Sequence, residues 1–467
     1  MRRPLTVLAA AVLAAVPAFA QLRMPAYERT ELPNGVTVYT LVKKDVPLVT
    51  LKALIKGGAE SQPDTKAGLA DITNDLLLRG SRNRNADEIA RDIDFLGAAV
   101  STFSGESANE VELEVLSKDV SEGVAILSDL VLNPTFPADE VTKELAQAKD
   151  EARSLKDNPQ AAIGAYASKY FYAGTGYPGA LVADEESYSR ISRDDITAYH
   201  ARQYVGANLV VIAVGDLDAA VLKAELAKAF GAAPKGEPYT WKKLGALARP
   251  AEARALLVDD NDSTQTYFRI MQPGIARTSP DRVPLLLVNT LFGGRFTSML
   301  NDALRVNAGI TYGASSVLDQ RRLPGALSIS TFTATATTGQ AVDLALEVLG
   351  TLRNKGISAE QLASAKAFLK GTAPTSLMET SDQLANVLAM FAIEGLNESE
   401  INDFFSRIDA VTLADTRRVI DKYYRADGLS FVLLGQKDAI EASAAKHAKN
   451  VTEVRITDPG ISVTPAK

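Results

Sequence analysis

Asp71, Asn74 and Asp75 form a polar group with the spacing of one helical face. They lie in the segment KAGLADITNDLLLRGS, residues 66–81, and positions i, i+3 and i+4 meet on the same side of a helix. Leucine and isoleucine residues make an apolar stripe beside them, which predicts that the group lies at the edge of a core. Two carboxylates and an amide there could be a metal site, the remnant of one, or a solvated helix face.

Histidine and cysteine are too scarce for several common active sites. The only histidines are His200 and His447, and the 467 residues include no cysteine. Neither histidine has a second histidine or cysteine nearby, which argues against a histidine-based zinc site, a Ser-His-Asp triad and a Cys-His dyad. The chain also lacks a GxxxxGK[ST] loop and a GxGxxG motif. A net charge of −7 gives no electrostatic footprint for nucleic acid.

The first twenty residues are typical of a secretory signal peptide. Arg2 and Arg3 precede an apolar run over residues 5–16, and Ala18-Phe19-Ala20 forms a small-x-small cleavage signal. The apolar run is too short to span a bilayer, and we expect no membrane span later in the chain. The sequence therefore predicts a periplasmic or secreted protein.

An internal repeat divides the rest of the chain into two parts. Residues 192–215 and 412–435 match when shifted by 220 positions, which places Asp195 on Asp415 and Gly215 on Gly435. Each copy predicts a helix, a short turn and a buried strand that ends at glycine. A repeat of this length indicates a duplicated domain and not a solenoid.

The grouping of strands and helices predicts an α+β fold. Each half opens with extended segments, continues with helices and then returns to alternating segments such as EVELEVLS and GALSISTFTAT. We expect two homologous halves, each a mostly antiparallel sheet with helices packed on one face. The predicted halves span residues 26–235 and 256–450, joined by an exposed linker at 236–255 that is rich in proline, glycine and lysine.

The sequence resembles the pitrilysin family of zinc peptidases, which includes insulin-degrading enzyme and the mitochondrial processing peptidase. The segments that carry the resemblance include ELPNGVTVYTLVKKDVPLVTLKALIKGG, NPTFPADEV, DEARSLKDNP and LFGGRFTSMLNDALRVNAGITYG. They occur in the family's order and cover nearly the whole chain after the signal peptide. The duplication also agrees with the paired-domain plan of that family.

By this resemblance, the family's His-x-x-Glu-His zinc motif falls on residues 71–75. Asp71 and Asp75 replace the two zinc-binding histidines, and Asn74 replaces the glutamate that acts as general base. The family's third ligand is a glutamate on another helix, and Glu151 falls at or beside that place. Without the histidines we interpret Glu151 as a solvated charge. An alternative is an oxygen cage of Asp71, Asp75 and Glu151 for calcium, magnesium or manganese.

The resemblance also assigns a role to Arg305 and Tyr312. We expect Thr297 or Ser298 to cap a helix that ends at Gly309, followed by a strand over residues 310–315, so that a turn brings Arg305 and Tyr312 together. A pair at this place and spacing holds the substrate backbone in the family. Both side chains donate hydrogen bonds and can bind a peptide carbonyl. The alternative is that Arg305 makes a local salt bridge and Tyr312 packs on the sheet.

Taken together, the chain resembles the zinc-lacking, Arg/Tyr-bearing subunit of a two-chain bacterial peptidase. This resemblance implies no metal or catalytic residue in the chain itself, a heterodimeric partner that supplies zinc and His-x-x-Glu-His, and an unfolded peptide as substrate. A homodimer is the other assembly to consider. One alternative function is a non-enzymatic assembly or scaffold protein of the same family. Another is a stand-alone peptidase that uses Asp71, Asp75 and Glu151.

Overall fold

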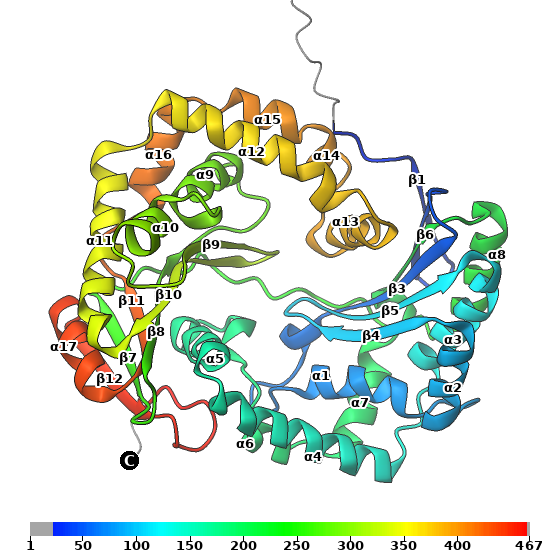
Figure 1. Cartoon of the computed structure of the whole chain (residues 1–467). Coiled ribbons are helices and arrows are strands. Elements are labelled where there is room, and N and C mark those ends of the chain that lie inside the picture. Colours follow the sequence, from blue (N-terminus) through cyan, green and yellow to red (C-terminus); the bar gives the residue numbers. More distant parts are fainter. Residues whose placement is uncertain (1–21, 465–467) are drawn as a thin grey trace, which may run out of the picture.

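The computed structural model describes residues 22–464 and contains two similar halves arranged around a central opening (Figure 1). Each half is built on one six-stranded sheet flanked by helices. The expected α+β fold with two homologous halves is therefore confirmed. The predicted signal peptide lies outside the described residues.

The two sheets share one strand order over five of their six strands. The order β2-β6-β3-β5-β4 in the first sheet matches β7-β11-β8-β10-β9 in the second, with the first pair parallel and the others antiparallel. The sixth strand differs, because β1 is antiparallel to β2 whereas β12 is parallel to β7. The first sheet contains, in spatial order, β1 (Tyr27–Glu31), β2 (Thr37–Val42), β6 (Leu209–Gly215), β3 (Leu48–Lys56), β5 (Ala108–Leu116) and β4 (Ala99–Ser104). The second contains β12 (Asn450–Arg455), β7 (Arg254–Asp259), β11 (Ser430–Gly435), β8 (Gln265–Pro273), β10 (Pro324–Ala334) and β9 (Ala314–Gln320).

Most of the helices lie in two groups, one per half. The first half contributes α1 (Leu69–Asp75), α2 (Ala86–Leu96), α3 (Val120–Leu132), α4 (Ala138–Ser154), α5 (Pro159–Tyr172), α6 (Glu185–Ser189), α7 (Arg193–Gln203) and α8 (Ala219–Phe230). The second contributes α9 (Arg282–Asn289), α10 (Met299–Asn301), α11 (Thr338–Lys355), α12 (Ala359–Leu377), α13 (Ser381–Glu394), α14 (Ser399–Asn402), α15 (Phe404–Ala410), α16 (Leu413–Tyr423) and α17 (Lys437–His447).

The repeat found in the sequence corresponds to α7–β6 and α16–β11. Both helices begin with a capping box, formed by Ser192 with Asp195 and by Thr412 with Asp415. Both are followed by a fully buried strand that ends at glycine. The same local sequence therefore specifies the same helix start and the same central strand in each half.

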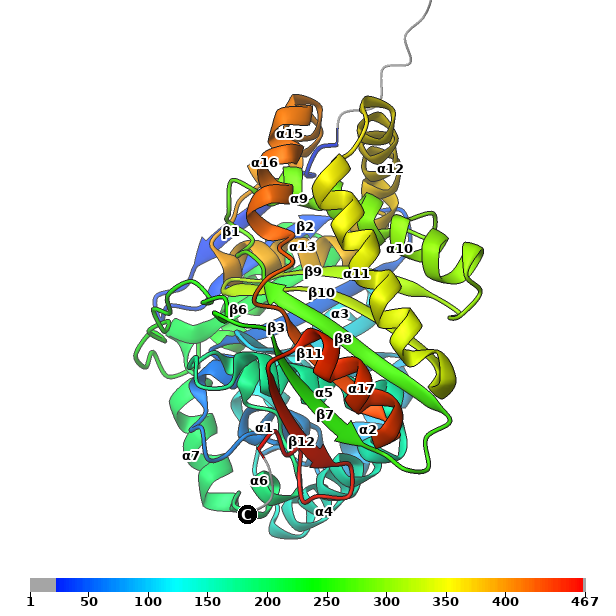
Figure 2. The ribbon, with the colours of Figure 1, turned by 90° about the vertical axis from the view of Figure 1, so that its left-hand side faces the viewer.

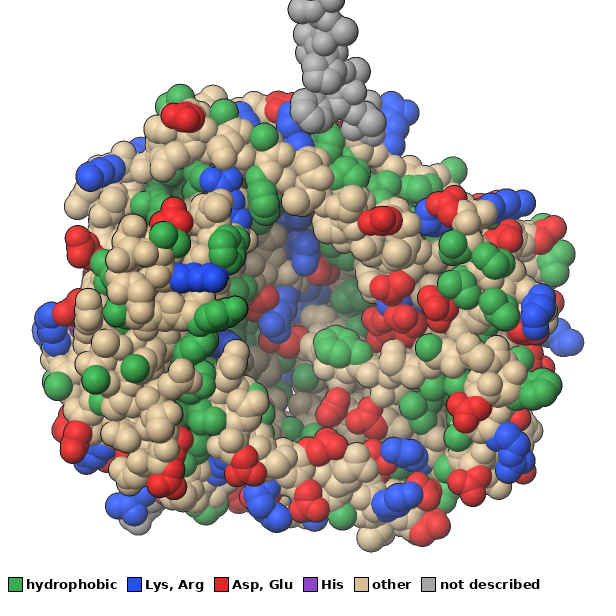
Figure 3. Space-filling view, viewed as in Figure 1, with side chains coloured by type: hydrophobic (Ala, Val, Ile, Leu, Met, Phe, Trp, Pro, Cys, Tyr) green, Lys and Arg blue, Asp and Glu red, His purple; other side chains and the backbone are tan. Residues whose placement is uncertain are grey.

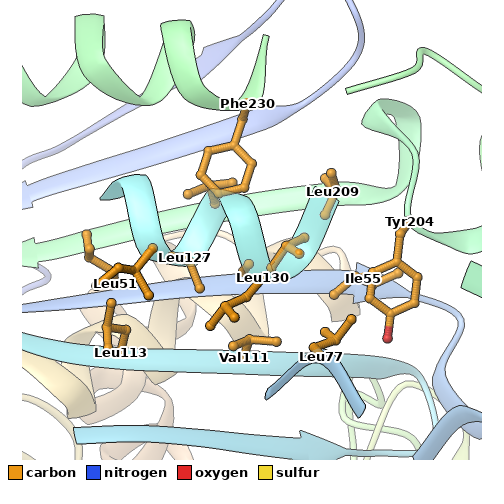
Figure 4. Close-up of a cluster of buried hydrophobic side chains, with 14 of the residues drawn as sticks. Leu51, Ile55, Leu77, Val111, Leu113, Leu127, Leu130, Tyr204, Leu209 and Phe230 are labelled. Carbon is orange, nitrogen blue, oxygen red and sulfur yellow. The ribbon is translucent and has the colours of Figure 1, made fainter. Parts of the chain in front are cut away.

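Each sheet has one face covered by helices of its own half. In the first half α3 packs over β3 and β5, where Leu127 and Leu130 meet Leu51 and Val111 (Figure 4). In the second half α11 and α17 cover the corresponding face (Figure 2). Burial of these apolar surfaces, at about 25 cal/mol per Å², is the main source of stability.

The opposite face of each sheet is covered by a helix from the other half. Helix α13 packs on β6 and β3 of the first sheet through Leu384, Leu388 and Phe391. Helix α5 packs on β11 and β8 of the second sheet in the same way. The sequence analysis expected helices on one face only. The second apolar face of each sheet explains why the two halves cannot separate without exposing a core.

A deep hollow opens where the two halves face each other. Figure 3 shows it in the centre of this side of the molecule, with charged side chains of both signs within it. The edge strands β4 and β9 border the central opening from opposite sides, and α5 and α13 lie beside it (Figure 1). An edge strand has unpaired backbone groups that another chain can use.

The connector between the halves is anchored rather than free. Glu60 accepts a hydrogen bond from the Lys242 backbone N–H at 2.6 Å and forms an ion pair with Arg322. The Arg322 guanidinium lies 4.2 Å from the centre of the Trp241 ring. These contacts hold the connector against both halves, while many of its residues are exposed.

One helical stretch among residues 22–464, Arg282–Asn307, is long and apolar enough to cross a membrane. Its most apolar part is 67% buried inside the protein, as expected for a helix of a protein core. The sequence analysis did not single out this stretch, because polar residues around Arg295 interrupt the apolar run.

Lys52 provides a test of the contact between the halves. Its buried ammonium group lies 2.6 Å from Glu110 and 3.0 Å from Asp382 of α13, and it also pairs with Glu112. Lys52→Met leaves these carboxylates without their cation, so we expect the free energy of unfolding to fall by about 3–5 kcal/mol in urea denaturation. Lys449→Met breaks the exposed ion pair with Glu252 and should change the free energy of unfolding by less than about 1 kcal/mol. Equal effects of the two substitutions would contradict this account.

Candidate functional site

Helix α1 carries the polar group at residues 71–75, as predicted. Leu69 and Ile72 are buried in the core of the first half, whereas Asp71 is exposed. Asn74 is fully buried between α1 and the sheet. The three polar residues therefore lie in different environments although they share one helical face.

Asn74 acts as a clip between α1 and the edge of the first sheet. Its amide group donates hydrogen bonds to the carbonyl oxygens of Phe103 at 3.1 Å and Glu110 at 2.9 Å. Its side-chain oxygen accepts one from the Tyr204 hydroxyl at 3.2 Å. With these bonds formed, the side chain has a structural role, and an amide cannot act as a general base near neutral pH.

The second half contains the same clip, built on Asn289. Its amide group donates to the Ser316 carbonyl of edge strand β9 at 3.0 Å, and its side-chain oxygen accepts from the Tyr424 hydroxyl at 3.3 Å. Tyr204 and Tyr424 match in the repeat. At this position, therefore, the first half has the same structural arrangement as the second.

Asp71 and Asp75 are carboxyl groups with raised pKa values. Burial raises the pKa of Asp75 to about 6, with further contributions from neighbouring acidic groups, against a hydrogen bond from Thr102 at 2.5 Å that lowers it. Removal of hydration by the surrounding protein also raises the pKa of Asp71, although solvent reaches this side chain. The Tyr188 hydroxyl donates to Asp71 at 3.3 Å. Both groups retain protons more readily than ordinary aspartates.

Helix α4 brings two glutamates toward α1. Glu151 is exposed and accepts a hydrogen bond from Gln147 at 2.9 Å, which agrees with its interpretation as a solvated charge. Glu144 is buried and forms an ion pair with Arg79 at 2.7 Å. The sequence analysis missed Glu144, although it lies seven residues, or two helical turns, before Glu151 on the same face.

These residues do not fit a zinc ion. Zinc favours imidazole and thiolate ligands, whereas this site offers two aspartates, one of them hydrogen-bonded to Thr102. Within residues 22–464 no three His, Cys, Asp or Glu side chains are grouped so that they could hold a metal ion. This finding also removes the support for an oxygen cage of Asp71, Asp75 and Glu151. His200 and His447 contribute nothing here, since they bond to Val131 and Asp343 instead.

The Arg305–Tyr312 pair is brought together beside edge strand β9. The Arg305 guanidinium carbon lies 5.0 Å from the centre of the Tyr312 ring and 4.6 Å from that of the Phe296 ring. Tyr312 and Phe296 are 77% and 67% exposed. Arg305 forms no ion pair with any residue from 22 to 464. Its donors remain available, and the local salt bridge considered as an alternative is not formed.

Asn301 fixes the two segments that carry this aromatic–cation group. It donates to the Phe296 carbonyl at 2.7 Å and accepts from the Ala314 backbone N–H at 3.2 Å. Ser298 caps the helix, as expected. The strand begins at residue 314 rather than 310, because Thr311 and Thr331 hold residues 311–313 in a turn through bonds to Gly313. Phe296 was not recognised from the sequence.

The two asparagine clips predict matched losses of stability. Asn74→Ala and Asn289→Ala each leave buried carbonyl and hydroxyl groups unpaired, so we expect each to lower the free energy of unfolding by about 1–3 kcal/mol. Urea denaturation followed by circular dichroism measures the change. Asn450 is exposed, and Asn450→Ala serves as the control. Its free energy of unfolding should stay within about 0.5 kcal/mol of the wild-type value. A stable Asn74→Ala protein would mean that the clip is not structural.

Asp75 predicts a pH-dependent stability. Because its folded-state pKa of about 6 exceeds the ordinary value of 3.8, the folded state binds the proton more tightly, and stability falls as pH rises from 4 to 6. Asp75→Asn removes this loss. Relative to wild type, it should gain up to about 3 kcal/mol above pH 7 and almost nothing at pH 4. A constant difference across this range in urea denaturation would contradict the assignment.

Comparison with known proteins identifies the family. The profile described as insulinase (peptidase family M16) matches residues 38–185, and the one described as peptidase M16 inactive domain matches residues 190–369. An uncharacterized zinc protease of Mycobacterium leprae is 25% identical over 402 residues, which cover 85% of this chain and 90% of that protein. The mitochondrial-processing peptidase subunit beta of Blastocladiella emersonii is 24% identical over 277 residues, covering 59% of this chain and 58% of that protein.

A solved structure agrees with this relationship. The crystal structure of a peptidase M16 inactive domain from Pseudomonas fluorescens has a TM-score of 0.81 at 24% identity and covers 88% of this chain and 98% of its own. It shares the fold. The two family profiles together span most of the chain, from the first sheet to α12. This chain therefore belongs to the insulinase-like M16 family of peptidases.

Proposed function

We propose that this chain is the substrate-binding, zinc-lacking subunit of a pitrilysin-type metallopeptidase. A partner subunit with a His-x-x-Glu-His motif would supply the zinc and the general base in trans. Such a complex would degrade or process unfolded peptides. The predicted signal peptide supports a periplasmic or secreted location for it.

The observation that carries the proposal is the half-buried Arg305 guanidinium, which contacts the exposed rings of Phe296 and Tyr312 and has no ion-pair partner among residues 22–464. Stacking against two rings fixes the plane of the guanidinium and leaves its edge free to donate hydrogen bonds. The Tyr312 hydroxyl adds another donor nearby. Carbonyl oxygens of an extended peptide accept hydrogen bonds of this kind whatever side chains the peptide has. The pair therefore suits binding of a peptide backbone near the bond to be cleaved.

The zinc-lacking part of the proposal is supported by the chemistry of α1. Asn74 stands at the position that the resemblance assigns to the general base, and it forms structural hydrogen bonds there, as Asn289 does in the second half. Asp71 and Asp75 have no arrangement that could hold a metal with a third acidic ligand among residues 22–464. The residues that could bind substrate remain, and those that could activate water do not.

One relative is named as the beta subunit of a mitochondrial-processing peptidase, so its name describes it as one subunit of a larger peptidase. This supports a two-chain arrangement here. We propose that an extended peptide adds to a sheet edge in the partner and that Arg305 and Tyr312 hold it from across the shared chamber. The edge strands of this chain would face that chamber.

Co-expression with a His-x-x-Glu-His subunit encoded nearby tests the proposal. We expect a complex that cleaves unfolded peptides. Tyr312→Phe removes one neutral hydrogen-bond donor, whose bond contributes about 0.5–1.5 kcal/mol, and should slow cleavage several-fold. Arg305→Ala removes a charged donor, whose bond contributes about 1.5–3 kcal/mol, and should slow cleavage tenfold or more.

Assembly and an unrelated arginine provide the controls. Both variants should form the complex to the same extent as wild type in size-exclusion chromatography. Arg82→Ala removes an exposed arginine of the first half and should retain full activity. If Arg305→Ala and Tyr312→Phe are also fully active in a correctly assembled complex, the pair is structural and the chain acts as a scaffold.

A further inference from the structure

Arg269 is a partly buried arginine without a counter-ion. It lies on β8, and among residues 22–464 its guanidinium forms no ion pair and no hydrogen bond. The Nε atom is buried and unpartnered. Burial lowers the pKa of Arg269, and no carboxylate is near enough to offset this effect. An arginine kept in this state within a fold is costly unless it has a ligand.

A row of hydroxyl groups leads from Arg269 to the edge of the sheet. Ser330 of β10 lies between the other two residues. Its partner on β8 is Arg269, and its partner on the edge strand β9 is Ser315. Residues opposite one another on neighbouring strands share a face of the sheet. Ser315 is exposed and Ser330 is half-buried. This face therefore presents two hydroxyls and then a guanidinium, from the rim inward.

These three residues line a pocket of about 310 Å³ between α5 and the second sheet. Ser168 and Tyr172 of α5 form another part of its wall. In Figure 1, α5, β9 and β10 all border the central opening, which agrees with a pocket on the chamber side.

Gly164 of α5 makes room for the guanidinium. A Cβ atom at this position would lie 3.3 Å from one terminal nitrogen of Arg269 and 3.7 Å from its Cζ atom. Glycine inside a helix costs about 1 kcal/mol relative to alanine. The glycine therefore allows Arg269 to lie against α5 within the pocket.

The other charged groups of the pocket are already paired. Asp319 accepts from Arg321 at 2.8 Å, and Arg321 also pairs with Glu106 of the first half. Both carboxylates thus share Arg321, and neither forms an ion pair with Arg269. Arg269 is the charged group of the pocket that has no ion-pair partner among residues 22–464.

We propose that Arg269, with Ser330 and Ser315, binds a carboxylate of the peptide substrate. Guanidinium and hydroxyl groups are donors, and a carboxylate accepts two parallel bonds from an arginine. The carboxylate is either the C-terminal group of the peptide or an aspartate or glutamate side chain. The identification of the ligand as a peptide rests on the proposed function, whereas the anion site itself does not.

The sheet geometry gives the position of this carboxylate on the peptide. Ser315 lies at the start of β9, just after the turn that carries Tyr312, and Arg269 lies two strands away, about 10 Å across the sheet. An extended peptide advances about 3.3 Å per residue. The carboxylate therefore lies at least about three residues from the carbonyl held by Arg305 and Tyr312.

Binding of three labelled peptides to the purified full chain tests the site. The peptides share one unstructured sequence and carry a free C-terminal carboxylate, a C-terminal amide, or the amide with one internal glutamate four residues from the end. Fluorescence anisotropy should show that the wild-type chain binds the amide about tenfold or more weakly than the free carboxylate, as for the loss of a charged hydrogen bond. If the glutamate peptide binds as tightly as the free carboxylate, a side-chain carboxylate can occupy the site. If it binds as weakly as the amide, the site requires the C-terminal carboxylate.

Arg269→Met should abolish this discrimination, so that all three peptides bind as weakly as the amide does. Its melting temperature should not fall, because the arginine has no partner to lose, and Arg82→Met should behave as wild type. Arg305→Ala should weaken the binding of all three peptides by the same factor. If Arg305→Ala has no effect while discrimination persists, the proposed function fails and the anion site stands. Equal affinity of the wild-type chain for all three peptides, or unchanged discrimination in Arg269→Met, overturns the site.

Discussion

The structure depends on the exchange of two helices between its halves. Each sheet has one face that the helices of its own half cover and an apolar area on the other face that they leave uncovered. Helix α13 of the second half covers the first sheet, and α5 of the first half covers the second. The exchange fixes the halves at a distance that leaves a hollow between edge strands β4 and β9, and it places Gly164 of α5 against Arg269. The candidate substrate surface is thus a product of core packing.

The duplication also explains what α1 has become. Asn289 joins a helix to an edge strand in the second half, with Tyr424 as its partner, and Asn74 does the same in the first half with Tyr204. The Asn74 amide donates to the buried carbonyls of Phe103 and Glu110, whereas an ionised carboxylate has no hydrogen to donate to them. The first half therefore has a buried hydrogen-bond network at the position where the resemblance to the pitrilysin family implies a general base. In the second half Arg305 contacts two aromatic rings and forms no ion pair among residues 22–464, which is the basis for the peptide-binding role proposed for it.

The sequence predicted the features that depend on local or periodic patterns. Helix α1, the repeated α7–β6 and α16–β11 units and the contact of Arg305 with Tyr312 follow from spacing, capping residues and turns. The helix exchange could not be predicted in this way, because α5 and α13 show no pattern that specifies which sheet they cover. Glu144 could have been found from its two-turn spacing to Glu151. Phe296 and Arg269 could not, since long-range packing determines their neighbours.

The central claim is that this chain binds peptide substrates without a metal of its own. Elemental analysis of the purified chain, combined with peptide binding and cleavage in the presence and absence of a chelator, tests it most directly. We predict less than stoichiometric zinc, no cleavage by the chain alone, and peptide binding that the chelator does not change. One tightly bound zinc per chain with chelator-sensitive cleavage would contradict the account.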